Sequence, residues 1–180
     1  MRIVAGERKG ARLAAPPGRA TRPTSDRVRE SLFAILADVG GAHVLDPFAG
    51  SGALGFEALS RGAADVAFCE LDMAALSVLR ENAARLRYAD RCTIRRQDGR
   101  RRLASDSAAG LTYDLILLDP PYQMLPSLTD RLATHLPALL APGGRAVLES
   151  DASGAAPELP LTALAERTYG GTRVTVLAHA

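Results

Sequence analysis

The chain has 180 residues, of which 47% are hydrophobic and 23% are charged, a composition typical of soluble globular proteins. This length suits one domain with a full hydrophobic core and is short for two ordinary domains. The sequence contains no apolar run long enough to cross a bilayer, and its first residues, MRIVAGERKG, lack the apolar segment of a signal peptide. We therefore expect a single domain, residues 1–180, that does not associate with a membrane.

The chain contains two cysteines, Cys69 and Cys92, and neither belongs to a CxxC pair. This pattern gives no disulfide framework and no metal-ligand spacing. We expect a protein that works in the reducing cytoplasm without a metal ion. Nothing in the sequence indicates an obligate protein partner.

The formal net charge of +2 hides an uneven distribution. Residues 1–40 hold eight basic and four acidic side chains, a net charge of +4 that leaves −2 for the rest of the chain. Nearly all of the basic residues are arginine, the side chain best suited to bidentate contacts with phosphate. The basic end therefore favours an RNA or DNA partner. An ordinary solvated surface of an arginine-rich chain is the alternative.

Residues 1–24 combine a short apolar run, RIV, with several glycines and prolines, which predicts a small β-hairpin arm outside the core and then a turn-rich loop. Thr24 and Ser25 are N-cap residues for a helix over residues 25–39, whose apolar side chains recur at helical spacing. Arg27 and Arg29 lie in its first turn, where positive charge opposes the helix dipole. Either a function or ion pairs with neighbouring acids would explain this placement.

In residues 42–180, apolar strand-like runs alternate with helical patterns, which is typical of a mainly parallel sheet covered on both faces. The last two strands are joined only by Gly170 and Gly171, which leaves no room for a crossover helix and requires antiparallel pairing. The predicted strands cover residues 43–48, 66–71, 92–95, 113–119, 143–150, 165–169 and 172–178, and the predicted helices cover 54–61, 73–86, 100–104 and 128–140.

A glycine-rich turn follows the first of these strands. In DPFAGSGALG, Gly50, Gly52 and Gly55 form the pattern G-x-G-x-x-G between a strand and a helix. Glycines there allow the backbone to approach a ligand and leave the helix N-terminus facing it. Glu70 ends the second strand, where an acid can accept hydrogen bonds from ribose hydroxyls. Together these features predict an adenosine-containing cofactor at the carboxyl edge of the sheet.

Asp46 ends the first strand, directly before the glycine turn. A carboxylate there would repel the pyrophosphate of a dinucleotide, but it suits a cofactor with a cationic amine and sulfonium and no phosphate. We therefore predict S-adenosylmethionine. Asp98 follows the third strand and is a candidate for binding the adenine amino group, with a helix cap or a surface charge as the alternative. With Asp119, four acids follow four successive strands.

The sequence LDPPY, Leu118 to Tyr122, ends the fourth strand. Its two prolines fix φ at about −65° and remove two N–H donors, so the chain must leave the sheet as a stiff corner. The Asp119 carboxylate and the Pro120 carbonyl can accept the hydrogens of an exocyclic amine, so that its nitrogen lone pair points at a methyl donor. Pro121 adds rigidity, and Tyr122 can stack on an extracted base. A stiff turn with a core tyrosine is the alternative.

These motifs resemble those of class I S-adenosylmethionine-dependent N-methyltransferases, and more narrowly those of the RsmD family, bacterial enzymes that methylate the N2 amine of a guanine in 16S ribosomal RNA. The similarity covers nearly the whole chain, in RIVAGERKGARL, RPTSDRVRESLFAIL, DPFAGSGALGFEALSRGA, LDPPY and YGGTRVTVL. One departure is Ala5, where the family commonly has a second glycine. The resemblance implies a Rossmann-like fold with a seven-stranded sheet, S-adenosylhomocysteine as the cofactor product, and the small ribosomal subunit or an assembly intermediate as the substrate.

The resemblance also implies that the arm and the start of the first helix contact ribosomal RNA, with Thr24 and Arg27 near the cofactor. The expected cofactor-binding residues are Thr24, Arg27, Asp46, Phe48, Gly50, Gly52, Glu70, Leu71, Asp98, Gly99 and Asp119. The expected catalytic residues are Asp119, Pro120, Pro121 and Tyr122. The expected RNA contacts, made to phosphate and not to bases, are Arg2, Arg8, Lys9, Arg12, Arg22 and Arg29. A second cluster, Arg95, Arg96, Arg100, Arg101 and Arg102, would widen the basic face, although Asp98 lies within it.

Three alternatives remain open. The same core could methylate adenine in DNA, but sequence-reading DNA enzymes usually add a recognition domain, for which this chain has no spare length. It could methylate a glutamine amide in a protein, but those enzymes typically have Asn where this chain has Asp119. It could also be an RNA-binding module with a vestigial cofactor site, against which the intact Asp46, glycine turn, Glu70 and DPPY corner argue.

Overall fold

The structure, a computed structural model, describes residues 1–16, 26–36 and 38–179. One sheet contains seven strands in the order β3-β2-β1-β4-β5-β7-β6. β1 to β5 pair in parallel, and β7 runs antiparallel to both β5 and β6. The predicted sheet, mainly parallel with an antiparallel last strand, is therefore confirmed. The strands are β1 (His43–Asp46), β2 (Asp65–Glu70), β3 (Cys92–Arg96), β4 (Tyr113–Leu118), β5 (Leu140–Asp151), β6 (Thr162–Tyr169) and β7 (Thr172–Ala178).

The helices follow the predicted order, with different ends. α1 ends at Leu36, earlier than predicted, and α4 continues to Ala108 through a polar segment in which no apolar spacing marks a helix. α5 begins at Leu125 because Pro126 fits the first turn, where a backbone N–H has no helical partner. The α-helices are α1 (Asp26–Leu36), α2 (Ala53–Ser60), α3 (Met73–Arg85), α4 (Gly99–Ala108) and α5 (Leu125–Leu139), and the 3₁₀ turns are η1 (Ala89–Arg91) and η2 (Tyr122–Met124).

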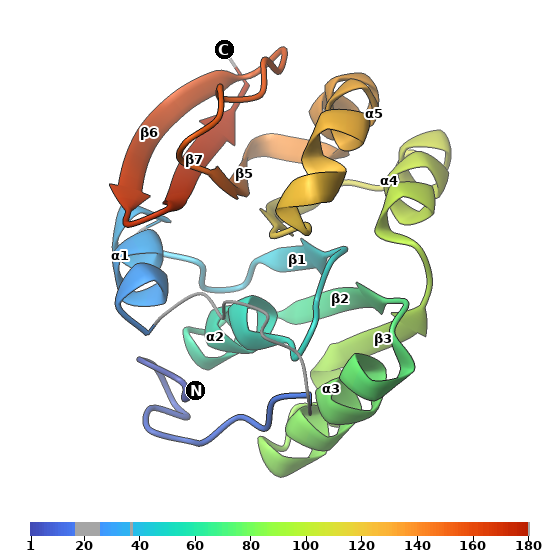
Figure 1. The fold of residues 1–180 in the computed structure, drawn as a ribbon. Coiled ribbons are helices and arrows are strands. Elements are labelled where there is room, and N and C mark those ends of the chain that lie inside the picture. The colour runs from blue at the N-terminus through green and yellow to red at the C-terminus, as the bar shows by residue number, and fades with distance from the viewer. Residues whose placement is uncertain (17–25, 37, 180) are drawn as a thin grey trace.

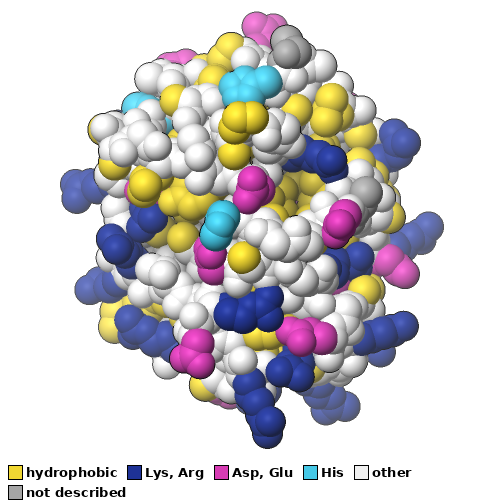
Figure 2. Space-filling model, turned by 180° about the vertical axis from the view of Figure 1, so that it is seen from behind, with side chains coloured by type: hydrophobic (Ala, Val, Ile, Leu, Met, Phe, Trp, Pro, Cys, Tyr) yellow, Lys and Arg dark blue, Asp and Glu magenta, His cyan; other side chains and the backbone are white. Residues whose placement is uncertain are grey.

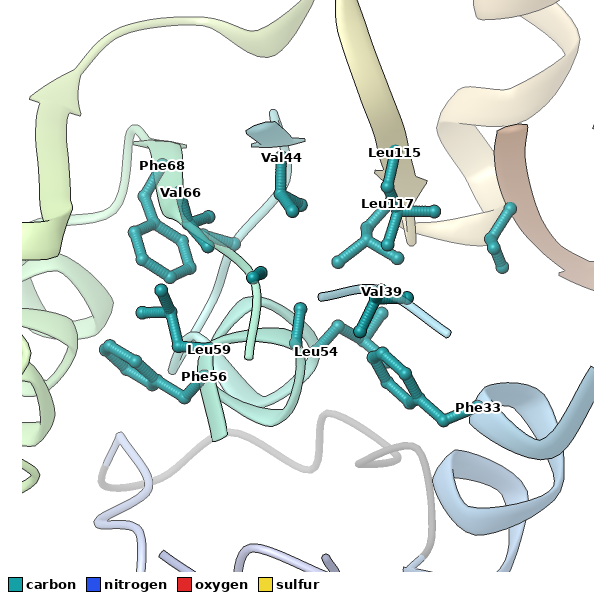
Figure 3. Close-up of a cluster of buried hydrophobic side chains, with 14 of the residues drawn as sticks. Phe33, Val39, Val44, Leu54, Phe56, Leu59, Val66, Phe68, Leu115 and Leu117 are labelled. Carbon is teal, nitrogen blue, oxygen red and sulfur yellow. The ribbon is translucent and has the colours of Figure 1, made fainter. Parts of the chain in front are cut away.

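Helices cover both faces of the sheet, as predicted (Figure 1). α1, α2 and α3 pack on one face, and α4 and α5 pack on the other. Consecutive strand residues point to opposite faces, so Val44 belongs to the first core and Leu45 to the second. Figure 3 shows the first core, where Phe56 and Phe68 pack with their ring centroids 5.0 Å apart. Within the described residues, every helix is too short or too polar to cross a membrane.

The first sixteen residues differ from the prediction of an arm outside the core. An antiparallel bridge between Arg2 and Arg12 gives the expected hairpin-like turn, but Ile3 and Leu13 are 1% and 6% exposed and belong to the first core. The buried Glu57 carboxylate of α2 accepts the backbone N–H groups of Val4 and Ala5 at 2.8 and 3.0 Å. The sequence did not reveal this anchor because its partners lie more than fifty positions away. The segment is part of the fold.

The arginines expected to contact RNA in this region are largely used by the fold. Arg29 is fully buried, and its guanidinium donates to the Arg2 carbonyl at 2.6 Å and to Asp26 at 2.7 Å, so its assignment as an RNA contact is wrong. Arg2 pairs with Asp26 at 3.2 Å. The Arg8 Nε donates to the Leu86 carbonyl at 2.9 Å, and its guanidinium lies 5.5 Å from the Tyr88 ring centroid. Exposed side chains of this group are Arg2, Lys9 and Arg12, while Arg22 lies outside the described residues.

Candidate active site

The carboxyl edge of the sheet brings the predicted acids together. Asp46 is the last residue of β1, Glu70 is the last residue of β2, and Asp119 follows β4 directly. Because these strands are parallel neighbours, their carboxyl ends lie at one edge. Both Asp119 and Glu70 act electrostatically on Asp46. At least three of the four acids identified in the sequence therefore form a cluster in the structure.

Asp46 is the most strongly perturbed acid of the cluster. Burial raises the pKa of its carboxyl to about 8, and the negative charges of Asp119 and Glu70 add to the increase. Backbone N–H groups of Gly55 and Phe48 act in the opposite direction but do not compensate. A cationic ligand group at this edge would favour ionised Asp46 and relieve the repulsion. The electrostatics of this edge thus favour a ligand group with positive charge.

The glycine turn has the backbone shape that the sequence predicted. Gly50 and Gly52 adopt φ values of +54° and +83°, which residues with a Cβ rarely adopt. A Cβ at Gly52 would lie 2.4 Å from both Leu79 and Phe56, so this glycine also lets α2 pack closely. At Gly50, in contrast, a Cβ would meet no atom within 4 Å. Gly50 therefore borders open space at the N-terminal end of α2.

Glu70 holds the glycine turn in place. One of its carboxylate oxygens accepts the Gly50 N–H at 2.8 Å, and the other accepts the N–H groups of Leu71 and Asp72 at 2.7 and 2.8 Å. Leu71 and Met73, the apolar residues next to it, are 51% and 57% exposed. Exposed large apolar side chains beside a carboxylate form a surface to which an adenosine ring and ribose fit. The structure places these residues together, and their contact with a cofactor stays a prediction.

Asp98 has the capping role that was considered as its alternative. Its carboxylate accepts the Arg100 backbone N–H at 2.8 Å and pairs with the Arg100 guanidinium at 2.5 Å, which lowers its pKa. It thereby caps α4. Gly99 is needed for close packing, because a Cβ there would lie 2.2 Å from the Pro47 carbonyl oxygen. This contact brings the end of β3 against the turn after β1, with half-buried Phe48 beside it.

The DPPY corner leaves β4 as a stiff connection into η2. Pro120 is buried and Pro121 is exposed. The Tyr122 hydroxyl lies 2.8 Å from the Thr172 Oγ1, at the first residue of β7. Because β7 runs antiparallel, its first residue reaches the same edge as the ends of β1 and β4. The sequence analysis gave Thr172 no role, although the motif YGGTRVTVL contains it.

Two further expected cofactor-binding residues belong to the start of the first helix and to the segment before it. Arg27 lies exposed in the first turn of α1. Thr24 lies outside the described residues.

Among the residues that the structure describes, no group of three or more His, Cys, Asp or Glu side chains is arranged to hold a metal ion.

Comparisons with known proteins place this geometry in a family. A family profile described as "Conserved hypothetical protein 95" matches residues 1–178. The chain belongs to this family, the RsmD family. Over 98% of its length it is 35% identical to the "Putative rRNA methyltransferase YlbH" of Bacillus subtilis, of which 97% is covered. It is also 39% identical, over 130 residues, to the "Ribosomal RNA small subunit methyltransferase D" of Escherichia coli, covering 68% of this chain and 61% of that protein.

The fold has solved counterparts. The "putative methyltransferase yhhF" of Escherichia coli superposes over 100% of this chain and 98% of its own, with a TM-score of 0.86 and 31% identity. A "putative methylase" of Haemophilus influenzae has a TM-score of 0.74 at 28% identity and covers 98% of this chain and 97% of its own. The Rossmann-like methyltransferase fold expected from the sequence is therefore confirmed.

Proposed function

We propose that this protein transfers a methyl group from S-adenosylmethionine to the exocyclic N2 amine of a guanine in 16S ribosomal RNA. The observation that carries this proposal is the buried Asp46, whose pKa is raised to about 8 by burial and by the charges of Asp119 and Glu70. Such a site gains most from a ligand that brings positive charge and no phosphate. Membership of the family supports ribosomal RNA as the substrate class, because its named relatives are ribosomal RNA methyltransferases.

The residues present fit that cofactor. S-adenosylmethionine, when bound, supplies an activated methyl group on a cationic sulfonium. Gly50 borders open space where a ligand can approach the backbone. Glu70 would accept hydrogen bonds from the ribose, and exposed Leu71 and Met73 would contact the adenine ring. Phe48, Asp98 and Gly99 would complete the adenosine end, and Arg27 would approach the cofactor from the first turn of α1. Thr24, outside the described residues, is proposed to contact the cofactor as well.

The DPPY corner would act on the guanine. The exocyclic amine is a poor nucleophile because its lone pair is delocalised into the ring. Hydrogen bonds from the amine to the Asp119 carboxylate and the Pro120 carbonyl would turn the lone pair toward the methyl donor. Pro121 keeps these acceptors still, and Tyr122, held by Thr172 at 2.8 Å, would stack on the extracted base. The small subunit or an assembly intermediate in the cytoplasm is the proposed substrate.

Labelled cofactor tests the proposal. The protein is incubated with labelled S-adenosylmethionine and, in parallel, naked 16S RNA, assembled small subunits, DNA and ribosomal proteins, and the label is mapped. We expect label on one guanine N2 of the RNA, and none with an Asp119→Ala variant. Label on adenine in DNA or on a glutamine would establish one of the other methyltransferase readings. Failure to bind the cofactor would indicate an RNA-binding module with a vestigial site.

A further inference from the structure

The region after the second strand is as basic as the N-terminal region. Residues 71–101 contain eight arginines and four acids, which is a net charge of +4. Three of the arginines have acidic partners: Arg85 pairs with Glu81, Arg91 with Glu7 and Arg100 with Asp98. The others are solvent-exposed, and no ion pair joins them to another described residue.

Three exposed arginines lie in the segment where β3 ends and α4 begins. Arg95 and Arg96 stand in register with Cys69 and Glu70 of β2, and consecutive strand residues project to opposite faces. The Arg96 Nε lies 3.5 Å from the Leu71 carbonyl oxygen, at the edge that carries the acids. Arg101 is exposed in the first turn of α4. Arg95 and Arg96 thus lie on either side of the end of this edge strand, and we name the surface that Arg95, Arg96 and Arg101 form around it the β3 arginine face.

The fold alone does not account for this arrangement. Positive charge in the first turn of a helix is unfavourable because it opposes the helix dipole. In that turn, Arg100 is compensated by Asp98, and Arg102 is buried with Asp106 and Tyr113. Arg101 has no such compensation among the described residues. β3 is an edge strand, and charge on an edge strand can prevent sheet-to-sheet aggregation, which is the competing explanation for Arg95 and Arg96.

We propose that the β3 arginine face binds the phosphates of the RNA that flanks the target nucleotide. This inference rests on the proposed function. Guanidinium groups suit phosphate, and this face borders the candidate active site through the register of Arg96 with Glu70. In the N-terminal region, Arg8 and Arg29 are engaged by the fold, and Arg2, Lys9 and Arg12 are exposed. Figure 2 shows Lys and Arg side chains at both the left and the right of the face in view, so the position beside the candidate active site, not positive charge alone, distinguishes the β3 arginine face.

A pair of charge-matched double variants tests the proposal. The test variant is Arg95→Glu/Arg101→Glu, which leaves Arg96 beside Leu71 unchanged. The control is Arg131→Glu/Arg167→Glu, which alters two exposed arginines on α5 and β6, β6 being the opposite edge of the sheet. Affinity for assembled small subunits and for naked 16S RNA is measured against salt concentration. We expect the test variant to bind at least tenfold more weakly, with a salt slope smaller by about 1.4–1.8, because two contacts are lost and each phosphate contact contributes about 0.7–0.9.

The control variant is expected to keep the parent's slope within experimental error. If both variants lost the same affinity and salt slope, the cause would be a general charge effect, and the proposal would be overturned. Unchanged binding by the test variant, with increased aggregation, would assign the arginines to edge protection. Cofactor affinity and melting temperature verify folding, and Arg95→Gln/Arg101→Gln replaces the test variant if charge reversal unfolds it. If the parent binds neither assembled small subunits nor 16S RNA, the proposed function fails first, and this inference fails with it.

Discussion

The acids at the two edges of the sheet differ in their burial and in the charges around them. At the amino edge, Asp65 lies 2.6 Å from the His43 Nδ1, and Asp114 accepts the His43 backbone N–H at 2.8 Å. At the carboxyl edge, Asp46 is buried, and the charges of Asp119 and Glu70 raise its pKa further. Both sets of acids accept hydrogen bonds within the fold, but only in the second set does burial beside other carboxylates leave net repulsion, which acts on Asp46. This difference supports the proposal that the carboxyl edge binds a ligand group with positive charge.

Open space alone does not distinguish the two edges. A cavity of about 290 Å³ lies at the amino edge, lined in part by Asp38, Asp114 and Arg145. Asp38 accepts the Gly40 N–H at 2.8 Å, and the Arg145 guanidinium donates to the Leu36 carbonyl. The polar groups of this cavity therefore have partners within the fold. We take the electrostatics of the carboxyl edge, and not the size of a cavity, as the sign of the functional site.

Removal of Asp119 should have the largest effect. Asp119→Ala is expected to lower turnover by about two to three orders of magnitude, the usual cost of losing one contact made to developing charge. Cofactor affinity should change much less. The matched control is Asp114→Ala at the opposite end of β4, which should keep turnover close to that of the parent. Single-turnover methyl transfer measures both, and equal losses would remove the distinction between the edges.

Removal of Glu70 should have the next largest effect. Glu70→Ala is expected to weaken S-adenosylmethionine and S-adenosylhomocysteine alike by about 10- to 100-fold, because hydrogen bonds to a charged group contribute about 1.5–3 kcal/mol. Both ligands carry the same ribose, and the Gly50 N–H would also lose its acceptor. Asp65→Asn, at the other end of β2, is the control. If calorimetry shows that the affinity for both cofactor ligands is unchanged, Glu70 only holds the glycine turn in place.

The hydrogen bond between Tyr122 and Thr172 should have a smaller effect. Thr172→Val is expected to lower turnover by about 2- to 12-fold, since a typical hydrogen bond contributes about 0.5–1.5 kcal/mol, and Thr172→Ser should restore it. Tyr122→Phe should give the same loss, and the double variant should lose no more. The control is Tyr169→Phe, which removes a tyrosine hydroxyl contact to Ser31 from the hairpin that β6 forms with β7. It should leave turnover unchanged. Additive losses would show that Thr172 does not position Tyr122.

The sequence predicted most of the fold because strand and helix signals are local. Apolar runs marked the strands, and the absence of a crossover before β7 required its antiparallel direction. The ends of α4 and α5 were less predictable, because polar residues up to Ala108 and Pro126 within the first turn resemble loop signals. Parallel order also explains why Asp46, Glu70 and Asp119 were correctly expected at one edge.

Contacts between distant segments were not predictable. Charge counting cannot tell an exposed arginine from Arg29, whose burial depends on the Arg2 carbonyl and Asp26. The burial of Ile3 and the anchoring of its neighbours by Glu57 require α2 to lie beside the N-terminal segment. A premise of the arm's predicted RNA role, that it contributes little to the core, is therefore wrong.

The pH dependence of stability tests the repulsion at the carboxyl edge most directly. The pKa of Asp46 is 3.8 when unperturbed and about 8 in the folded, ligand-free protein. The folded state therefore binds more protons between these values, so the contribution of Asp46 to stability is full below pH 3.8 and is lost as pH rises to about 8. In Asp46→Asn no such proton is bound. Urea unfolding of parent and variant at each pH measures the difference.

We predict that Asp46→Asn becomes progressively more stable than the parent as pH rises from about 4 to about 8, with a constant difference at higher pH. The melting temperature at neutral pH should exceed that of the parent by at least 2–4 °C, roughly the shift for 1 kcal/mol in a chain of this size. A stability difference that does not change with pH would contradict the account, because it would mean that Asp46 ionises as freely in the folded protein as in the unfolded chain.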